Sequence, residues 1–125
     1  MNILIDSCVF LWITSKPDRL SKKAEEIFHN PDVRLFLSIM SIWELTIKHT
    51  SKPDTLSEPP EILFPKQYAY YDMDILPLKE EVIYHTSALP LHHKDPFDRM
   101  LICQALAHDL TILTPDENFR KYEGV

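Results

Sequence analysis

The chain has 125 residues, of which 45% are hydrophobic and 26% charged, an ordinary composition for a globular protein with one hydrophobic core. Its formal net charge of −6 at pH 7 excludes a broad basic surface, so we do not expect it to bind duplex DNA by itself. Gly124 is the only glycine, which excludes a glycine-rich phosphate-binding loop.

The cysteines and the start of the chain bear on the compartment and the number of domains. Cys8 and Cys103 are far apart and form no metal-binding motif, and two thiols fit a reducing environment. The chain opens on a short apolar run without a basic signal segment, and it contains no long apolar stretch. We therefore expect a cytoplasmic protein without membrane association, formed by a single domain over residues 1–125.

Short apolar runs alternate with segments of helical periodicity along the chain. Ser21 and Asp95 each precede a helical pattern and are expected to cap it, and either Ser38 or Ser41 is expected to begin another helix. Strands are predicted at 2–6, 33–38, 74–78 and 110–114. Helices are predicted at 22–29, from 38 or 41 to about 49, at 61–71, at 80–88, at 96–107 and from about 115. This alternation predicts an α/β fold with a parallel sheet and helices on both faces.

Four carboxylates occur at structural junctions of this predicted fold. Asp6 ends the first strand, and Glu44 lies about two turns into the helix that follows the second. Asp98 falls in the first turn of the helix after Asp95, and Asp116 follows the last strand. Because ligand sites of such folds lie beyond the carboxyl ends of the strands, we expect these four side chains to meet at one edge of the sheet.

Each carboxylate also has a purely structural interpretation. Asp6 and Asp98 would stabilise helix starts, and Asp116 would interact favourably with a helix dipole. Glu44 would pair with Lys48, four residues later on the same helix. This interpretation suits Glu44 least, because its helix has little polar surface and a half-buried carboxylate needs a partner.

Four converging carboxylates repel one another unless a cation lies between them. The hard divalent cations Mg²⁺ and Mn²⁺ prefer oxygen ligands of this kind. Their usual chemistry at such sites is hydrolysis of phosphodiester bonds by metal-activated water. The residues show no Ser-His-Asp or Cys-His pattern that would indicate a different nucleophile.

The segments Ile3–Ser7, Ser41–Lys48, Leu89–Arg99 and Leu113–Asp116 closely resemble those of PIN-domain proteins, in order and in spacing. They are most similar to the VapC-type toxins of bacterial toxin–antitoxin pairs. The His-His-Lys-Asp-Pro-Phe-Asp-Arg motif at 92–99 is the most specific part of the resemblance.

The resemblance implies a three-layer α/β/α sandwich with a central, mainly parallel sheet of four or five strands, the fifth near the C-terminus. It implies an endoribonuclease dependent on Mg²⁺ or Mn²⁺, with an antitoxin protein as partner and a homodimer as the oligomeric state. The catalytic and metal-binding residues it implies are Asp6, Glu44, Asp98 and Asp116.

Five further residues are candidates for supporting roles. Ser7 and Thr114 are expected to donate hydrogen bonds to the carboxylates or to water at the site. Asp95 is expected to cap the helix that carries Asp98, and Lys48 is a candidate cation for the RNA backbone. Arg99 is expected either to face a substrate phosphate or to pair with a surface acid.

Two aromatic or apolar segments leave alternatives open. Tyr68, Tyr70 and Tyr71 could stack on RNA bases, but packing in the core or between subunits is favoured. The apolar run Val9–Ile13, with Trp12, indicates a surface for a partner, and the resemblance implies that an antitoxin covers it. The alternative function is a non-catalytic PIN-like module that uses its acidic groove to hold a partner.

Overall fold

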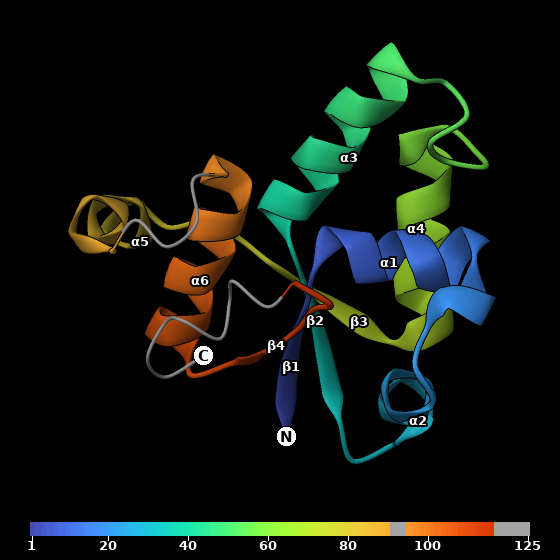
Figure 1. Cartoon of the computed structure of the whole chain (residues 1–125), viewed down its shortest axis with the longest axis horizontal. Coiled ribbons are helices and arrows are strands. Elements are labelled where there is room, and N and C mark those ends of the chain that lie inside the picture. Colours follow the sequence, from blue (N-terminus) through green and yellow to red (C-terminus); the bar gives the residue numbers. More distant parts are fainter. Residues whose placement is uncertain (91–94, 117–125) are drawn as a thin grey trace.

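The computed structural model describes residues 1–90 and 95–116, and Figure 1 shows a central sheet between two groups of helices. The strands are β1 (Asn2–Ile5), β2 (Arg34–Ser38), β3 (Met73–Leu76) and β4 (Thr111–Leu113). The helices are α1 (Ser7–Ser15), α2 (Lys22–His29), α3 (Ile39–Ser51), α4 (Pro60–Tyr71), α5 (Glu80–His85) and α6 (Pro96–His108). Two 3₁₀ turns, Pro17–Arg19 and Thr86–Ala88, follow α1 and α5.

The sheet has the strand order β3-β2-β1-β4, and all three neighbouring pairs are parallel. In the register of the central strand, Ile3 pairs with Leu35 on one side and with Thr111 on the other. The predicted parallel α/β fold is therefore confirmed. The fifth strand expected near the C-terminus and the helix expected from about 115 lie outside the described residues, except for Pro115 and Asp116, which are not helical.

Side chains of the strands alternate between two cores, as a pleated strand requires. Ile3 and Ile5 of β1 join a core that includes Phe10 of α1, whose ring stacks on Phe64 of α4 with centroids 5.2 Å apart. Leu4, between them, faces the other core, where α6 covers the sheet. The helices α1, α2 and α4 lie on one side of the sheet in Figure 1 and α5 and α6 on the other, which gives three layers.

Side-chain caps mark the starts of three helices, α2, α3 and α6. Ser21 accepts a hydrogen bond from the Ala24 N–H at 3.1 Å and begins α2 as predicted. Ser38, rather than Ser41, caps α3, which runs to Ser51 and so past the predicted end near 49. Asp95 caps α6, as expected.

The remaining predicted boundaries differ from the structure by a few residues. The strand expected at 74–78 is Met73–Leu76, because Pro77 lacks the N–H that would continue the ladder. The helix expected at 80–88 ends at His85 and continues as the Thr86–Ala88 3₁₀ turn. No helix in the described part of the chain is long and apolar enough to cross a membrane.

A buried polar pair connects the sheet to α6. Ser38, at the end of β2, donates a hydrogen bond to Oε1 of Gln104 at 2.5 Å, and both side chains are 0% exposed. The Gln104 amide donates in turn to the Pro77 carbonyl at 3.4 Å. From the sequence, Ser38 is expected only to cap a helix, and no role is expected for Gln104. This pair sets the position of α6 relative to the start of α3.

Candidate active site at the carboxyl edge of the sheet

One pocket of about 320 Å³ lies where the parallel strands end, and five carboxylates line it: Asp6, Glu44, Asp95, Asp98 and Asp116. Asp6 directly follows β1, and Glu44 comes from the second turn of α3. Asp98 lies in the first turn of α6 and Asp116 beyond β4. The structure thus brings together the four acids predicted from the sequence. The wall of the pocket also includes Ser7, Cys8, Lys48 and Asp95.

Asp6 is held between the ends of two neighbouring strands. Its backbone N–H donates to the Leu113 carbonyl at 3.1 Å, which extends the pairing of β1 with β4 by one residue. The Thr114 hydroxyl donates to the Asp6 carboxylate at 2.6 Å and accepts from the Asp116 N–H at 3.1 Å. Thr114 therefore orients Asp6 and the backbone that leads to Asp116.

Glu44 is 7% exposed and has two partners, as its burial requires. The Ser7 hydroxyl donates to one carboxylate oxygen at 2.7 Å. The Lys48 ammonium lies 3.5 Å from the other oxygen, so the predicted pair within the helix is present alongside the placement in the pocket. Since the Lys48 side chain is 55% exposed, the buried Ser7 hydrogen bond fixes Glu44 more firmly than the ion pair does.

Burial raises the pKa of Asp6 above its ordinary value of 3.8, and the nearby negative charge of Glu44 adds to the rise. The Thr114 hydrogen bond and the N–H groups of Cys8 and Ser7 act in the opposite direction. These two N–H groups lie near the carboxylate without the geometry of a capping hydrogen bond. Because the raised pKa favours the protonated form, the ionised Asp6 destabilises the native state.

Asp6→Asn is therefore expected to raise the free energy of unfolding near neutral pH in the presence of a chelator, because the amide oxygen still accepts from Thr114 and no charge is buried. In the parent protein, the free energy of unfolding falls as pH rises from 3.8 through the raised pKa, and the loss is constant above it. The gain in the variant should accordingly shrink towards pH 3.8. Urea unfolding at pH values between about 4 and 7 measures it.

Asp32→Asn, at an exposed turn, is the matched control and should show no such trend. A gain in Asp6→Asn that is the same at every pH would show that the buried charge is not its cause.

The carboxylates line the walls of the pocket and do not converge on one point. Within residues 1–90 and 95–116, no three carboxylate, histidine or cysteine side chains are close enough together to hold a metal ion as they are oriented. Mutual repulsion favours such a spread, and Thr114 and Ser7 hold Asp6 and Glu44 in place. The donor set consists of carboxylate oxygens and suits Mg²⁺ or Mn²⁺, so the residues fit such an ion after side-chain rotations.

The model of the family described as PIN domain matches residues 3–125. The chain belongs to the PIN domain family.

Two solved structures have a fold similar to that of this PIN domain. One is the crystal structure of VapBC2 from Rickettsia felis bound to a DNA fragment from their promoter, with 14% identity and a TM-score of 0.73, covering 100% of this chain and 96% of that chain. The other is VapBC-1 from nontypeable Haemophilus influenzae, with 15% identity and a TM-score of 0.60, covering 97% and 91%. No curated protein sequence matches significantly.

The two helical turns that carry Glu44 and Asp98 contact each other in this PIN domain. Asp95 accepts hydrogen bonds from the N–H groups of Phe97 at 2.9 Å and of Asp98 at 3.4 Å. The Phe97 ring meets the Trp43 ring edge to face, with centroids 5.4 Å apart. Since Trp43 and Phe97 directly precede Glu44 and Asp98, this contact sets the distance between the two acid-bearing turns.

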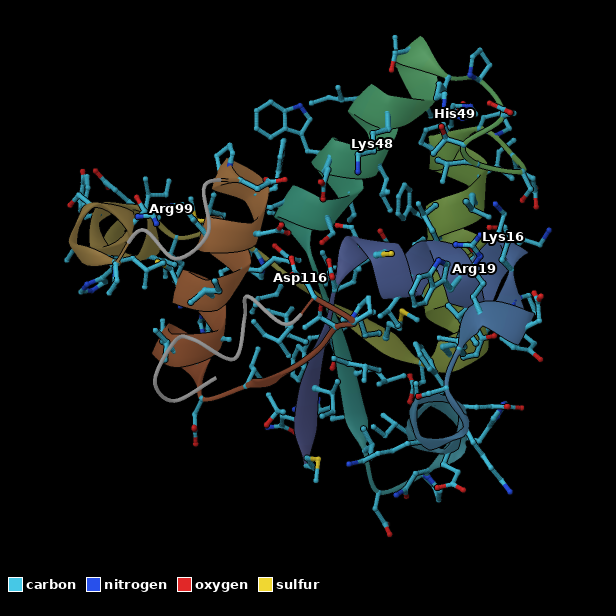
Figure 2. All side chains as sticks on the ribbon, viewed as in Figure 1. Lys16, Arg19, Lys48, His49, Arg99 and Asp116 are labelled. Atoms are coloured by element: carbon cyan, nitrogen blue, oxygen red, sulfur yellow. The ribbon has the colours of Figure 1, made fainter. Side chains whose placement is uncertain are left out.

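The position of Arg99 corrects the sequence analysis. Its guanidinium donates to the carbonyls of Thr86 at 2.8 Å, Leu89 at 3.0 Å and Pro90 at 3.0 Å. It is absent from the pocket wall, and Figure 2 shows it beside α5, away from Asp116. Arg99 therefore fixes the segment after α5 to α6, and it does not line the acidic pocket.

Two of the three tyrosines of α4 pack in the core, as the favoured interpretation expected, and Tyr70 does not. Tyr68 and Tyr71 pack on the core, and burial raises the pKa of Tyr68 to about 12. Tyr70 is 74% exposed and contacts the Tyr71 ring. None of the three lines the acidic pocket.

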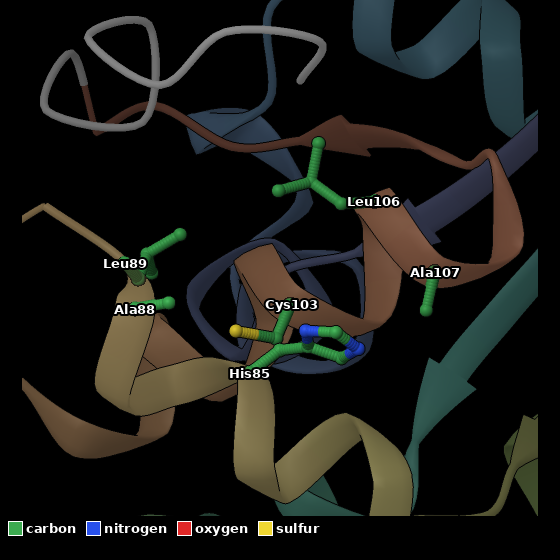
Figure 3. A pocket seen from close by; sticks show the side chains of 6 residues that line it. All are labelled: His85, Ala88, Leu89, Cys103, Leu106 and Ala107. Carbon is green, nitrogen blue, oxygen red and sulfur yellow. The ribbon is translucent and has the colours of Figure 1, made fainter.

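A second pocket, of about 330 Å³, lies between α5, the turn after it and α6 (Figure 3). His85, Ala88 and Leu89 line one side and Cys103, Leu106 and Ala107 the other. Its wall is mainly apolar and includes no carboxylate, so it is not the site of the acidic cluster.

Proposed function

We propose that this PIN domain is an endoribonuclease that depends on Mg²⁺ or Mn²⁺ and acts as the toxin of a toxin–antitoxin pair. The observation that carries the proposal is the convergence of Asp6, Glu44, Asp98 and Asp116 on one pocket at the carboxyl edge of a parallel sheet. The resemblance of the sequence to VapC-type toxins supports it, as does the name VapBC of both similar structures.

The four carboxylates would hold the ion after side-chain rotations, and the protein brings them to one pocket beforehand. When bound, such an ion stabilises the charge that develops on the phosphate oxygens and lowers the pKa of water. Thr114 orients Asp6, and Ser7 orients Glu44, so that two of the acids are already fixed by buried or half-buried hydroxyl groups. Lys48 places a positive charge at the rim, where a phosphate of the substrate would pass.

The proposal includes two protein partners, an antitoxin and a second copy of the chain in a homodimer. It also includes a cytoplasmic location. The run Val9–Ile13 offers less surface than expected, because Val9 and Phe10 are buried in the core. A clearer apolar surface lies on α3, where three exposed side chains recur at helical spacing: Ile39, Trp43 and Ile47, which are 41%, 57% and 45% exposed.

Purified protein incubated with total cellular RNA is expected to cut it in the presence of Mg²⁺ and to leave it intact in excess EDTA, with the cut ends mapped by sequencing. Mn²⁺ is expected to raise the melting temperature, because a ligand at 100 times its dissociation constant stabilises by about 2.7 kcal/mol. The proposal is wrong if RNA stays intact with Mg²⁺ and Mn²⁺ present and the melting temperature does not move.

The alternative, a non-catalytic module that holds a partner in its acidic groove, is favoured by one observation. The carboxylates of the described residues do not form a ready three-donor cluster. This alternative predicts neither stabilisation by Mn²⁺ nor cleavage, so the same two measurements separate the functions.

A further inference from the structure

A groove of about 340 Å³ continues from the acidic pocket along α1. Leu11 lines both the groove and the pocket, so the two are adjacent. On one side the groove is lined by Trp12 and Ser15 of α1 and by Lys16, which directly follows α1, and on the other by the segment 52–57 that follows α3. The ring of Trp12 is half-buried in this wall.

The sign of the charge changes between the pocket and the groove. The wall of the acidic pocket holds five carboxylates and one ammonium group, that of Lys48. The wall of the groove holds the ammonium groups of Lys16 and Lys52 and one carboxylate. Positive side chains therefore adjoin the pocket on the α1 side. Figure 2 shows Lys48, Lys16 and Arg19 on that side of the molecule and Arg99 at the opposite end.

Several other cations of the described chain are engaged elsewhere. Arg34 pairs with Asp74 at 2.7 Å, and Lys66 with Glu58 at 2.7 Å. Lys16 and Lys52, in contrast, are exposed and form no ion pair within the described residues. Asp54 also lines the groove, so two ammonium groups there face one carboxylate.

We propose that the groove formed by Trp12, Lys16 and Lys52 binds the single-stranded RNA that flanks the cut, with the lysines on its phosphates. The proposal rests on the proposed function and adds the path of the substrate. The groove wall carries two ammonium groups against one carboxylate and adjoins the acidic pocket, so it attracts a polyanion. Trp12 is partly exposed and lines the groove, and an aromatic side chain in such a place can stack on an unpaired base.

The test measures binding of a short unstructured oligoribonucleotide with Mg²⁺ present, in an Asp98→Asn background to prevent cleavage. Lys16→Gln with Lys52→Gln is expected to weaken binding roughly tenfold to a hundredfold at low salt. The slope of log affinity against log salt concentration should become shallower by about 1.4, or about 0.7 for each lost phosphate contact. Lys22→Gln with Lys79→Gln changes the net charge equally, outside the groove, and should bind like the background protein.

Tryptophan fluorescence locates the bound strand, because the chain has two tryptophans. Trp43→Phe leaves Trp12 alone, and its emission should be quenched by the oligoribonucleotide. Trp12→Phe leaves Trp43, which lines neither the pocket nor the groove, and should show little quenching.

Some outcomes would overturn the proposed path of the RNA and leave the proposed function intact. One is that the parent cuts RNA while both double lysine variants bind the oligoribonucleotide with equal affinity. Another is that the oligoribonucleotide quenches the emission of Trp43 alone. Lysine substitutions that weaken an antitoxin but not RNA would likewise overturn it and assign the groove to a protein. Failure of the parent to cut any RNA would instead remove the proposed function.

Discussion

Asp98→Asn is expected to reduce Mg²⁺-dependent RNA cleavage at least about a hundredfold, since substitutions even of groups that only support a metal ligand cost 10- to 100-fold. The melting temperature should change little, because the start of α6 is capped by Asp95 and does not depend on the Asp98 charge. The amide has the size of the carboxylate but lacks its charge. Cleavage of a labelled RNA and thermal unfolding of the same preparation measure the two effects.

Asp95→Asn is the matched control, three residues away on the same helix start. Asparagine caps helices as well as aspartate does, so this variant should fold normally and lose far less activity. Parent-like cleavage by Asp98→Asn would exclude Asp98 from the reaction. A large fall in the melting temperature of Asp98→Asn would show that its loss of cleavage reflects unfolding.

Gln104→Leu is expected to lower the free energy of unfolding by about 2 kcal/mol, the cost of leaving a buried polar group unpaired. The substitution preserves the approximate volume of the side chain but removes the acceptor of the Ser38 hydroxyl, which is 0% exposed. Denaturant unfolding monitored by circular dichroism measures the change. Gln67→Leu is the control, because Gln67 is a half-buried residue of α4. Its free energy of unfolding should stay within about 0.5 kcal/mol of that of the parent.

A double-mutant cycle tests whether the pair itself is responsible. Ser38→Ala alone should cost about 1 kcal/mol or more, because it also removes the cap on the Met40 N–H. The double variant should be more stable than the sum of the single changes predicts, since neither partner is then left unpaired. Strict additivity would mean that Ser38 and Gln104 contribute independently and that the hydrogen bond does not couple them.

Much of the fold could be predicted because it depends on local chemistry. The caps at Ser21 and Asp95 bond to N–H groups two or three residues away, so each can be recognised from a short segment. The meeting of Asp6 with Glu44 followed from strand direction alone, because parallel strands end at one edge.

What escaped prediction depends on contacts distant in sequence. The Ser38–Gln104 bond joins residues 66 positions apart, and its only trace in the sequence is a glutamine within the apolar face of α6. The three carbonyls bound by Arg99 lie 9 to 13 residues before it, in a turn whose path depends on how α5 packs on α6. These carbonyls accept the hydrogen bonds of the Arg99 guanidinium, a role that the sequence suggested for a surface acid or a phosphate.

The pairing of β1 with β4 has a consequence for the timing of folding. β1 is synthesised before β4, and both its partner β4 and the Thr114 hydroxyl that reaches Asp6 come 108 residues later. A growing chain on the ribosome therefore lacks one wall of the pocket until β4 and Thr114 have emerged. The topology thus makes completion of the pocket a late event in the folding of this domain.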